Sequence, residues 1–215
     1  MKKFISYVPM QVGDNLLKGR YIATGNSRLC VDKEVTFPVE CMIDGYAEPG
    51  ETIMLIALLE SGNADCRANL ERMKKVISES LARKGASLAV KTVEISPEET
   101  AKSHLNTFKN LISLLENGDE LYACVTFGTK PTPILEMMAL NFAYKNLENV
   151  TIGCIAYGKV NRVHNQPVSY YIYDITALFF MNNIVDTLSA INADDAYHKI
   201  EKILGLGFDD EATNK

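Results

Sequence analysis

Residues 120–138, with the sequence ELYACVTFGTKPTPILEMM, decide the fold of this chain. Residues 121–125 form an apolar, β-prone run, which predicts a buried strand of a parallel sheet covered on both faces. Residues 127–130 then break this pattern, and Pro131 or Pro133 can occupy the first turn of a helix. From Ile134 onward the sequence is helix-forming and apolar almost all round, so we expect a largely buried helix.

The turn between this strand and this helix has the outline of an anion-binding site. In such a turn, free backbone N–H groups and the positive end of the helix dipole point into the crevice beyond the strand. Gly128 lets the backbone approach a ligand, Thr129 offers a hydroxyl group, and Lys130 adds a full positive charge. The same residues also fit a polar turn with Lys130 in solvent, and the sequence alone leaves both interpretations open.

The composition indicates a soluble globular protein with one main domain and a small appendage. The chain has 215 residues, of which 47% are hydrophobic and 23% are charged. A formal net charge of −5 argues against a broad basic surface for duplex DNA or RNA, whereas a small anionic ligand remains compatible. The longest uninterrupted apolar run, residues 53–59, is too short to span a bilayer, so we expect no membrane partner.

The cysteines and histidines indicate neither disulfides nor a metal site. The five cysteines are odd in number and form no C-x-x-C pair, which favours free thiols in a reducing cytoplasm. His104, His164 and His198 are scattered and lack metal-ligand spacing. The sequence also lacks the dinucleotide, P-loop and hydrolase-elbow motifs. We therefore expect no metal and no cofactor.

Strands and helices are expected to alternate along most of the chain. Residues 29–32 and 35–46 are expected to pair as antiparallel strands, with Pro38 limiting part of the second to an edge. Ser96 and Pro97 have the pattern of a helix start. The other expected strands are 3–8, 52–59, 88–95, 151–157 and 168–175, and the expected helices are 64–84, 96–115, 176–191 and 194–204, before a frayed tail from 209.

This order predicts an α/β fold. We expect a Rossmann-like, doubly wound, mainly parallel sheet with helices on both faces, a β-hairpin or edge addition, and two C-terminal helices. The domain would span residues 1–180, followed by a helical extension and tail over 181–215. Ligands of such folds bind beyond the carboxyl ends of the strands, near a switch in strand order. The loop after the first strand, the turn at 128–130 and the connection 158–166 are expected to gather there.

Three short segments give the chain a resemblance to a known family. They are VTFGTKP at residues 125–131, IAYG at 155–158 and YDIT at 173–176. Together they resemble CARF domains, the CRISPR-associated Rossmann-fold sensors of type III antiviral immunity. Gly128, Thr129 and Lys130 are the most specific part of the resemblance.

The resemblance implies a homodimer that binds a cyclic oligoadenylate, most often the tetra-adenylate, across its two-fold axis. Some similar proteins, the ring nucleases, also cleave the ring without metal, with a ribose 2′-hydroxyl as nucleophile. By this resemblance Lys130 and Thr129 would be catalytic. The ligand-binding positions that it implies are Pro9, Gly25, Asn26, Thr126, Phe127, Gly128, Thr129, Lys130, Tyr157 and Gly158.

Residues 176–215 depart from most CARF proteins, which carry a fused effector. This stretch has no Arg-x-x-x-x-His ribonuclease motif, so a stand-alone sensor or ring nuclease is expected. One alternative is a regulatory subunit without catalysis that binds a protein partner through its C-terminal helices. Another is a Rossmann-like enzyme that acts on a different phosphorylated small molecule.

Overall fold

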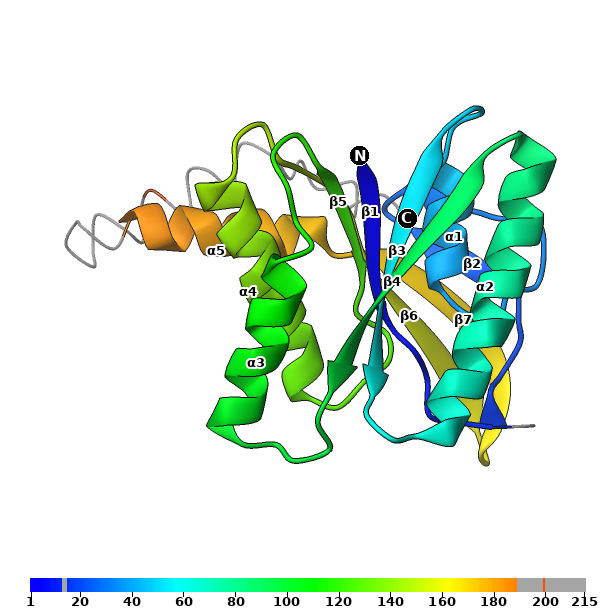
Figure 1. The fold of residues 1–215 in the computed structure, drawn as a ribbon. Coiled ribbons are helices and arrows are strands. Elements are labelled where there is room, and N and C mark those ends of the chain that lie inside the picture. The colour runs from blue at the N-terminus through cyan, green and yellow to red at the C-terminus, as the bar shows by residue number, and fades with distance from the viewer. Residues whose placement is uncertain (13–14, 189–198, 200–215) are drawn as a thin grey trace. The chain divides into compact units, whose positions relative to one another are not determined.

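The computed structural model describes residues 1–12, 15–188 and 199, and it divides into two compact units, residues 1–176 and 177–215. The first unit contains one seven-stranded sheet (Figure 1). Its strands are β1 (Lys2–Tyr7), β2 (Tyr21–Thr24), β3 (Thr52–Glu60), β4 (Ser87–Ile95), β5 (Glu120–Cys124), β6 (Thr151–Val163) and β7 (Gln166–Asp174). Its helices are α1 (Val39–Tyr46), α2 (Ala64–Lys84), α3 (Ala101–Ile112) and α4 (Pro131–Asn146), with a short 3-10 helix, η2 (Ser27–Leu29).

The sheet is doubly wound, as the sequence predicts. Its strand order is β2-β7-β6-β5-β1-β3-β4, and β1, β3, β4, β5 and β6 are parallel. Helices α1 and α2 cover one face, whereas α3 and α4 cover the other (Figure 1). Strand β7 runs antiparallel to β6, and β2 pairs with β7 at the edge. This α/β architecture is consistent with a Rossmann-like fold, and it includes the predicted edge addition.

The central strands are buried on both faces, which explains their continuous apolar sequences. Phe4 of β1 stacks on Tyr122 of β5, with ring centroids 4.5 Å apart, on the face covered by α1 and α2. On the opposite face, a buried ion pair joins Lys3 Nζ to Asp119 Oδ2 at 2.8 Å. Because Asp119 immediately precedes β5, this contact helps to fix the alignment of β1 with β5.

The predicted antiparallel pair at residues 29–32 and 35–46 is wrong. The chain forms η2 and then helix α1, and Pro38 is the N-cap of that helix instead of an edge-strand residue. Glu40 explains the change, because its Oε1 accepts hydrogen bonds from the backbone N–H groups of Thr36 (3.1 Å) and Phe37 (3.0 Å). A carboxylate that receives the N–H groups preceding a helix stabilises the helix start, which overrides the β-prone composition.

Two other predicted boundaries need correction. Helix α3 begins at Ala101, because Thr100 and Ser103 form the capping box that Ser96 was expected to start. Strand β6 continues past Gly158 to Val163, because β7 pairs with its outer half. Most of the expected connection at 158–166 is therefore strand, closed by a tight turn in which His164 and Asn165 have positive φ.

Helix α4 is buried on one side only, although the sequence predicts a largely buried helix. Its inward stripe, at helical spacing, is fully enclosed, whereas Ile134 and Met138 are 62% and 50% exposed. The buried residues are Thr132, Leu135, Glu136, Ala139, Leu140 and Ala143.

In the second unit the structure describes Lys199 and residues 177–188 of helix α5 (Thr176–Leu188). The predicted helix at 194–204 and the polar tail lie outside the described residues, apart from Lys199. Among the described residues, no helix is long and apolar enough to cross a membrane.

Candidate functional site at the switch point of the sheet

The strand order places a switch point between β1 and β5. After β1 the chain first forms β2 at the far edge, then builds β3 and β4 on one side of β1, and finally returns to build β5 and β6 on the other side. Loops that leave two such neighbouring strands in opposite directions open a crevice at their carboxyl ends, where ligands of this architecture bind. Pro9 follows β1 at this point, and the turn of residues 125–130 follows β5.

Gly128 gives the turn after β5 its shape. Its φ of 108° lies outside the range that other residues adopt without strain. A Cβ atom at this position would lie 2.9 Å from Cβ of Thr132, which is closer than a van der Waals contact. The hydroxyl groups of Thr129 and Thr132 are 3.3 Å apart, and the N–H of Thr132 donates to the carbonyl of Thr129 at 3.0 Å. These contacts hold the turn against the first residues of α4.

The backbone N–H groups that could bind a ligand belong to the turn and not to the first residues of α4. Pro131 and Pro133 have no N–H group, and Thr132 donates its own to Thr129. By contrast, no acceptor among the described residues receives the backbone N–H groups of Gly128, Thr129 and Lys130. Three consecutive free N–H groups followed by a helix dipole can receive an anionic oxygen.

Lys130 is exposed and stands at the N-cap of α4 with a helical backbone (φ −56°, ψ −35°). Within the described part of the chain it has no carboxylate partner. Its ammonium group is therefore available to a ligand that approaches the turn from solvent.

Thr126 and Gly158 tie the start of the turn to β6. The Oγ1 of Thr126 accepts a hydrogen bond from the N–H of Gly158 at 2.9 Å. A side chain at Gly158 would lie 2.7 Å from Cγ of Pro38, so this close packing requires glycine. Of the predicted site residues, Phe127 is half-buried in the turn and Tyr157 is exposed on β6 beside it.

A small cavity of about 20 Å³ lies behind the turn, and no motif in the sequence predicts it. A cavity of this size holds about one water molecule. Burial raises the pKa of Tyr7, so its hydroxyl group stays protonated and can donate into the cavity. His104, which the sequence predicts on a helix surface, also lines the cavity. The polar residues that line the cavity are Tyr7, Glu60, Ser96, Glu99, His104, Thr129 and Thr132.

A larger, open pocket of about 540 Å³ lies next to this cavity, between the ends of β3 and β4 and the start of α3. The two share Ser96 and Pro97. Its lining is polar, with Glu94, Glu98 and Lys102 as the charged residues. Among the described residues, no group of three or more His, Cys, Asp or Glu side chains is placed to hold a metal ion.

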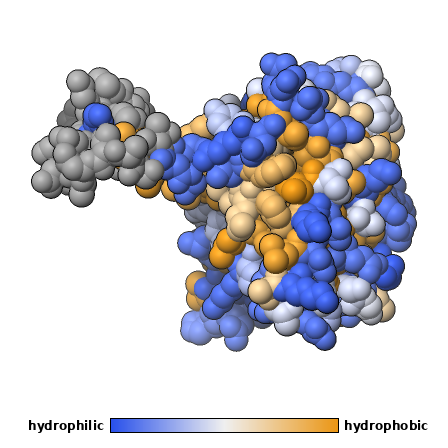
Figure 2. Space-filling model, turned by 60° about the vertical axis from the view of Figure 1, so that its left-hand side comes forward, coloured by the Kyte–Doolittle hydropathy of each residue, from blue (hydrophilic) through white to orange (hydrophobic). Residues whose placement is uncertain are grey.

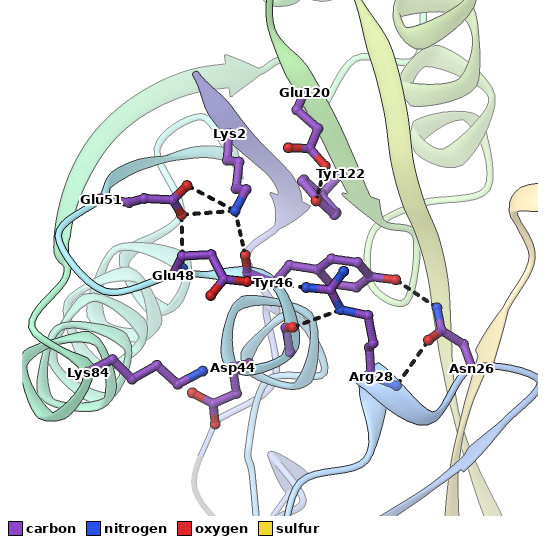
Figure 3. A network of polar contacts seen from close by, with 11 residues as sticks. Lys2, Asn26, Arg28, Asp44, Tyr46, Glu48, Glu51, Lys84, Glu120 and Tyr122 are labelled. Carbon is purple, nitrogen blue, oxygen red and sulfur yellow. Dashed lines mark hydrogen bonds and ion pairs between the residues drawn. The ribbon is translucent and has the colours of Figure 1, made fainter.

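Gly25 and Asn26 do not join the turn at the switch point. They follow β2, which runs opposite to the central strands, so the chain there heads away from the carboxyl ends of those strands. The Nδ2 of Asn26 donates to the hydroxyl of Tyr46 (2.7 Å) and to Oδ2 of Asp174 (2.6 Å). Figure 3 shows Asn26 directed at Tyr46, below Glu120 and Tyr122. The structure therefore gives Asn26 a packing role, and any ligand contact by it stays a prediction.

The segment around Asp174 also has a structural explanation. Its Oδ1 accepts hydrogen bonds from the N–H and hydroxyl groups of Thr176, at 2.9 Å and 2.5 Å. The hydroxyl of Thr176 accepts from the N–H of Ile155 at 2.8 Å. Residues 173–176, which contribute to the family resemblance, thus close the end of the sheet.

Glu136 is the unusual group near the site. It is fully buried on α4, one helical turn after Thr132, and neither carboxyl oxygen has a partner among the described residues. Burial raises the pKa of its carboxyl group well above the ordinary value, so the group is held in its neutral form. Burial raises the pKa of Cys124 to about 12, which makes that thiol unreactive.

No model of a known protein family matches the sequence, and a search of curated proteins finds no significant match.

Proposed function

We propose that this protein binds a cyclic oligoadenylate, tetra-adenylate in the first place, at the interface of a homodimer in type III CRISPR antiviral signalling. One observation carries the proposal. At the switch point between β1 and β5, the N–H groups of Gly128, Thr129 and Lys130, which have no acceptor among the described residues, lie together with the ammonium group of Lys130, which has no carboxylate partner in the same part of the chain. This is a site for phosphate oxygens, and the chain resembles CARF domains at these residues.

The dimer explains how one small turn recognises a ring. A cyclic tetranucleotide has rotational symmetry that a two-fold dimer matches, so each protomer supplies the same donors to the same ring. The outward side of α4 offers an apolar surface for such a pairing, with Ile134 and Met138 exposed one helical turn apart. Figure 2, which turns the side of α3 and α4 forward, shows apolar side chains gathered in the middle of this face.

We further propose that Lys130 and Thr129 assist cleavage of the ring. In this reaction the ribose 2′-oxygen bonds to the neighbouring phosphorus, and the bond from phosphorus to the 5′-oxygen breaks. The proton of the 2′-hydroxyl ends on the departing 5′-oxygen, which leaves a 2′,3′-cyclic phosphate and a 5′-hydroxyl group. A cation fixed beside the phosphate stabilises the charge that develops there by about 3 kcal/mol. Lys130 supplies that cation.

Incubation of the purified protein with labelled cyclic tetra-adenylate in EDTA tests both parts. We expect binding and a slowly formed linear product in the wild type. Lys130→Ala should weaken binding or abolish cleavage without unfolding the protein, whereas Lys109→Ala, an exposed lysine on α3, should change neither. Binding without a linear product would mean that the protein is a sensor, and it would contradict the proposed cleavage. Absence of binding to the cyclic tri-, tetra- and hexa-adenylates would remove the whole proposal.

A regulatory subunit that binds protein through its second unit is the second candidate. Helix α5 exposes Leu178 and Val185, at 56% and 53%, which suits a protein partner. This candidate predicts tight association with another chain that does not change when cyclic oligoadenylate is added.

A further inference from the structure

Three tyrosines and a lysine share one exposed face of the sheet next to the candidate site. Cys154 and Ala156 of β6 and Ile172 of β7 point into the core on the α1 side. Because side chains alternate along a strand, Tyr157, Lys159, Tyr171 and Tyr173 point to the opposite side. Tyr157 pairs directly with Tyr173, and Lys159 pairs with Tyr171, so the four form one continuous surface, the tyrosine face.

The tyrosine face is accessible and carries positive charge. Tyr157 is 40% exposed, Lys159 is exposed, and Tyr171 and Tyr173 are half-buried. The rings of Tyr171 and Tyr173 stack on each other, with centroids 6.1 Å apart and an angle of 24° between the planes. The carboxylate of Asp174 does not face Lys159, because it points to the α1 side of the sheet, where it accepts a hydrogen bond from Asn26.

The tyrosine face is continuous with the turn that follows β5. The N–H of Val125 donates to the carbonyl of Ala156 at 3.0 Å, and the N–H of Gly158 donates to Thr126 at 2.9 Å. Tyr157 lies between these two bonded residues of β6. A ligand whose phosphate sits on the Gly128–Lys130 turn would therefore reach Tyr157 with its nearest base.

We propose that the tyrosine face stacks the adenine bases of the nucleotide ligand, an inference that rests on the proposed function. Aromatic side chains interleaved with cations are the common platform for bases, because every base has a π-face that can stack. The turn would hold phosphate, Tyr157 and Tyr173 would hold bases, and Lys159 would neutralise a further phosphate. The chemistry differs from that of the α4 surface, where Ile134 and Met138 are purely apolar and suit a second copy.

A fluorescent ring tests this assignment. One adenine of cyclic tetra-adenylate is replaced by 2-aminopurine, whose fluorescence falls when the base stacks. We expect quenching on binding to the wild type and to Tyr157→Phe, which keeps the aromatic ring. Tyr157→Ala and Tyr173→Ala should each bind about tenfold more weakly and restore the fluorescence. Val163→Ala, an exposed residue of β6 outside the tyrosine face, is the matched control and should behave as the wild type.

The outcomes separate this proposal from the proposed function. Wild-type affinity and unchanged quenching in both alanine variants would overturn the base-stacking role and leave ring binding intact. If Tyr157→Ala instead turns a dimer into a monomer by sedimentation, the tyrosine face is a contact between copies and the proposal is wrong. A wild type that binds none of the rings would remove both proposals together.

Discussion

Gly128 is the residue on which the geometry of the candidate site depends. In Gly128→Ala the new methyl group meets Thr132 at 2.9 Å, at a φ of 108° that disfavours any side chain. We expect the turn to shift, the free energy of unfolding to fall by about 1–3 kcal/mol, and ring affinity to fall with it. Urea denaturation and a ring-binding titration measure the two effects.

Gly118→Ala is the matched control for Gly128→Ala. Gly118 also has a positive φ, 76°, but a Cβ there would meet no atom within 4 Å. The control should lose stability and keep ring affinity, because Gly118 precedes β5 and lies away from the turn that follows it. Equal ring affinity in the two variants would show that the turn does not bind the ring.

Glu136 makes the stability of the protein depend on pH. The pKa of the buried carboxyl group is raised in the native state, so the unfolded chain releases this proton at a lower pH than the folded protein does. The unfolded state then binds fewer protons, and stability falls as pH rises above the ordinary carboxyl range, by up to about 1.4 kcal/mol per pH unit.

Glu136→Gln and Glu136→Met remove this titration. The free energy of unfolding of each variant, relative to the wild type, should therefore increase from pH 4 to pH 7. Urea denaturation at each pH measures the difference. A difference that stays constant over this range would mean that Glu136 is ionised in the folded protein, against the raised pKa.

At the scale of elements, the buried ion pair of Lys3 and Asp119 aligns the two strands that flank the switch point. Both side chains are almost completely buried, and Asp119→Ala leaves Lys3 with the exposed carboxylate of Glu116, at 2.9 Å, as its charged partner. We expect Asp119→Ala to lower the free energy of unfolding by about 3 kcal/mol, at the lower end for a broken buried pair, because Glu116 keeps part of the attraction. The pair Lys74–Glu71 is a control of similar length, 2.7 Å, on the exposed side of α2.

Glu71→Ala should cost less than about 1 kcal/mol, because solvent screens an exposed pair. Similar losses in Asp119→Ala and Glu71→Ala, measured by urea denaturation, would mean that the Lys3–Asp119 pair is not sealed from water.

Elements whose signals are local could be predicted from the sequence. Helix α2 begins at Ala64 and ends before Gly85 as predicted, because Asn63 caps it and Gly85 has a φ of 70°. The β5–turn–α4 segment likewise depends on neighbouring residues: an apolar strand, a glycine and two prolines. For such segments the sequence and the fold agree, since the residues that determine the conformation are adjacent in the chain.

Elements that depend on distant partners could not be predicted. Helix α1 is the exception, because the contacts of Glu40 with Thr36 and Phe37 that replace the predicted strand are local, and the β-prone composition of the segment hides them. Asn26 has the residue type of a ligand contact, yet its partners Tyr46 and Asp174 come from other elements. The cavity behind Thr129 combines residues from three strand ends and two helices. No local sequence pattern predicts the contacts of Asn26 or the lining of this cavity, because residues that are distant in the sequence come together only when the sheet is assembled.

At the scale of the whole molecule, the proposal requires two copies whose turns face one ring. Ile134→Glu would place two like charges against each other across an isologous interface on α4, and we expect a monomer by sedimentation velocity. A monomer offers the ring one turn instead of two, so affinity for cyclic tetra-adenylate should fall at least tenfold. Val168→Glu, an exposed valine of β7, should leave both properties unchanged. A monomeric Ile134→Glu variant that keeps full affinity would show that each copy binds its ligand alone, which contradicts the shared site.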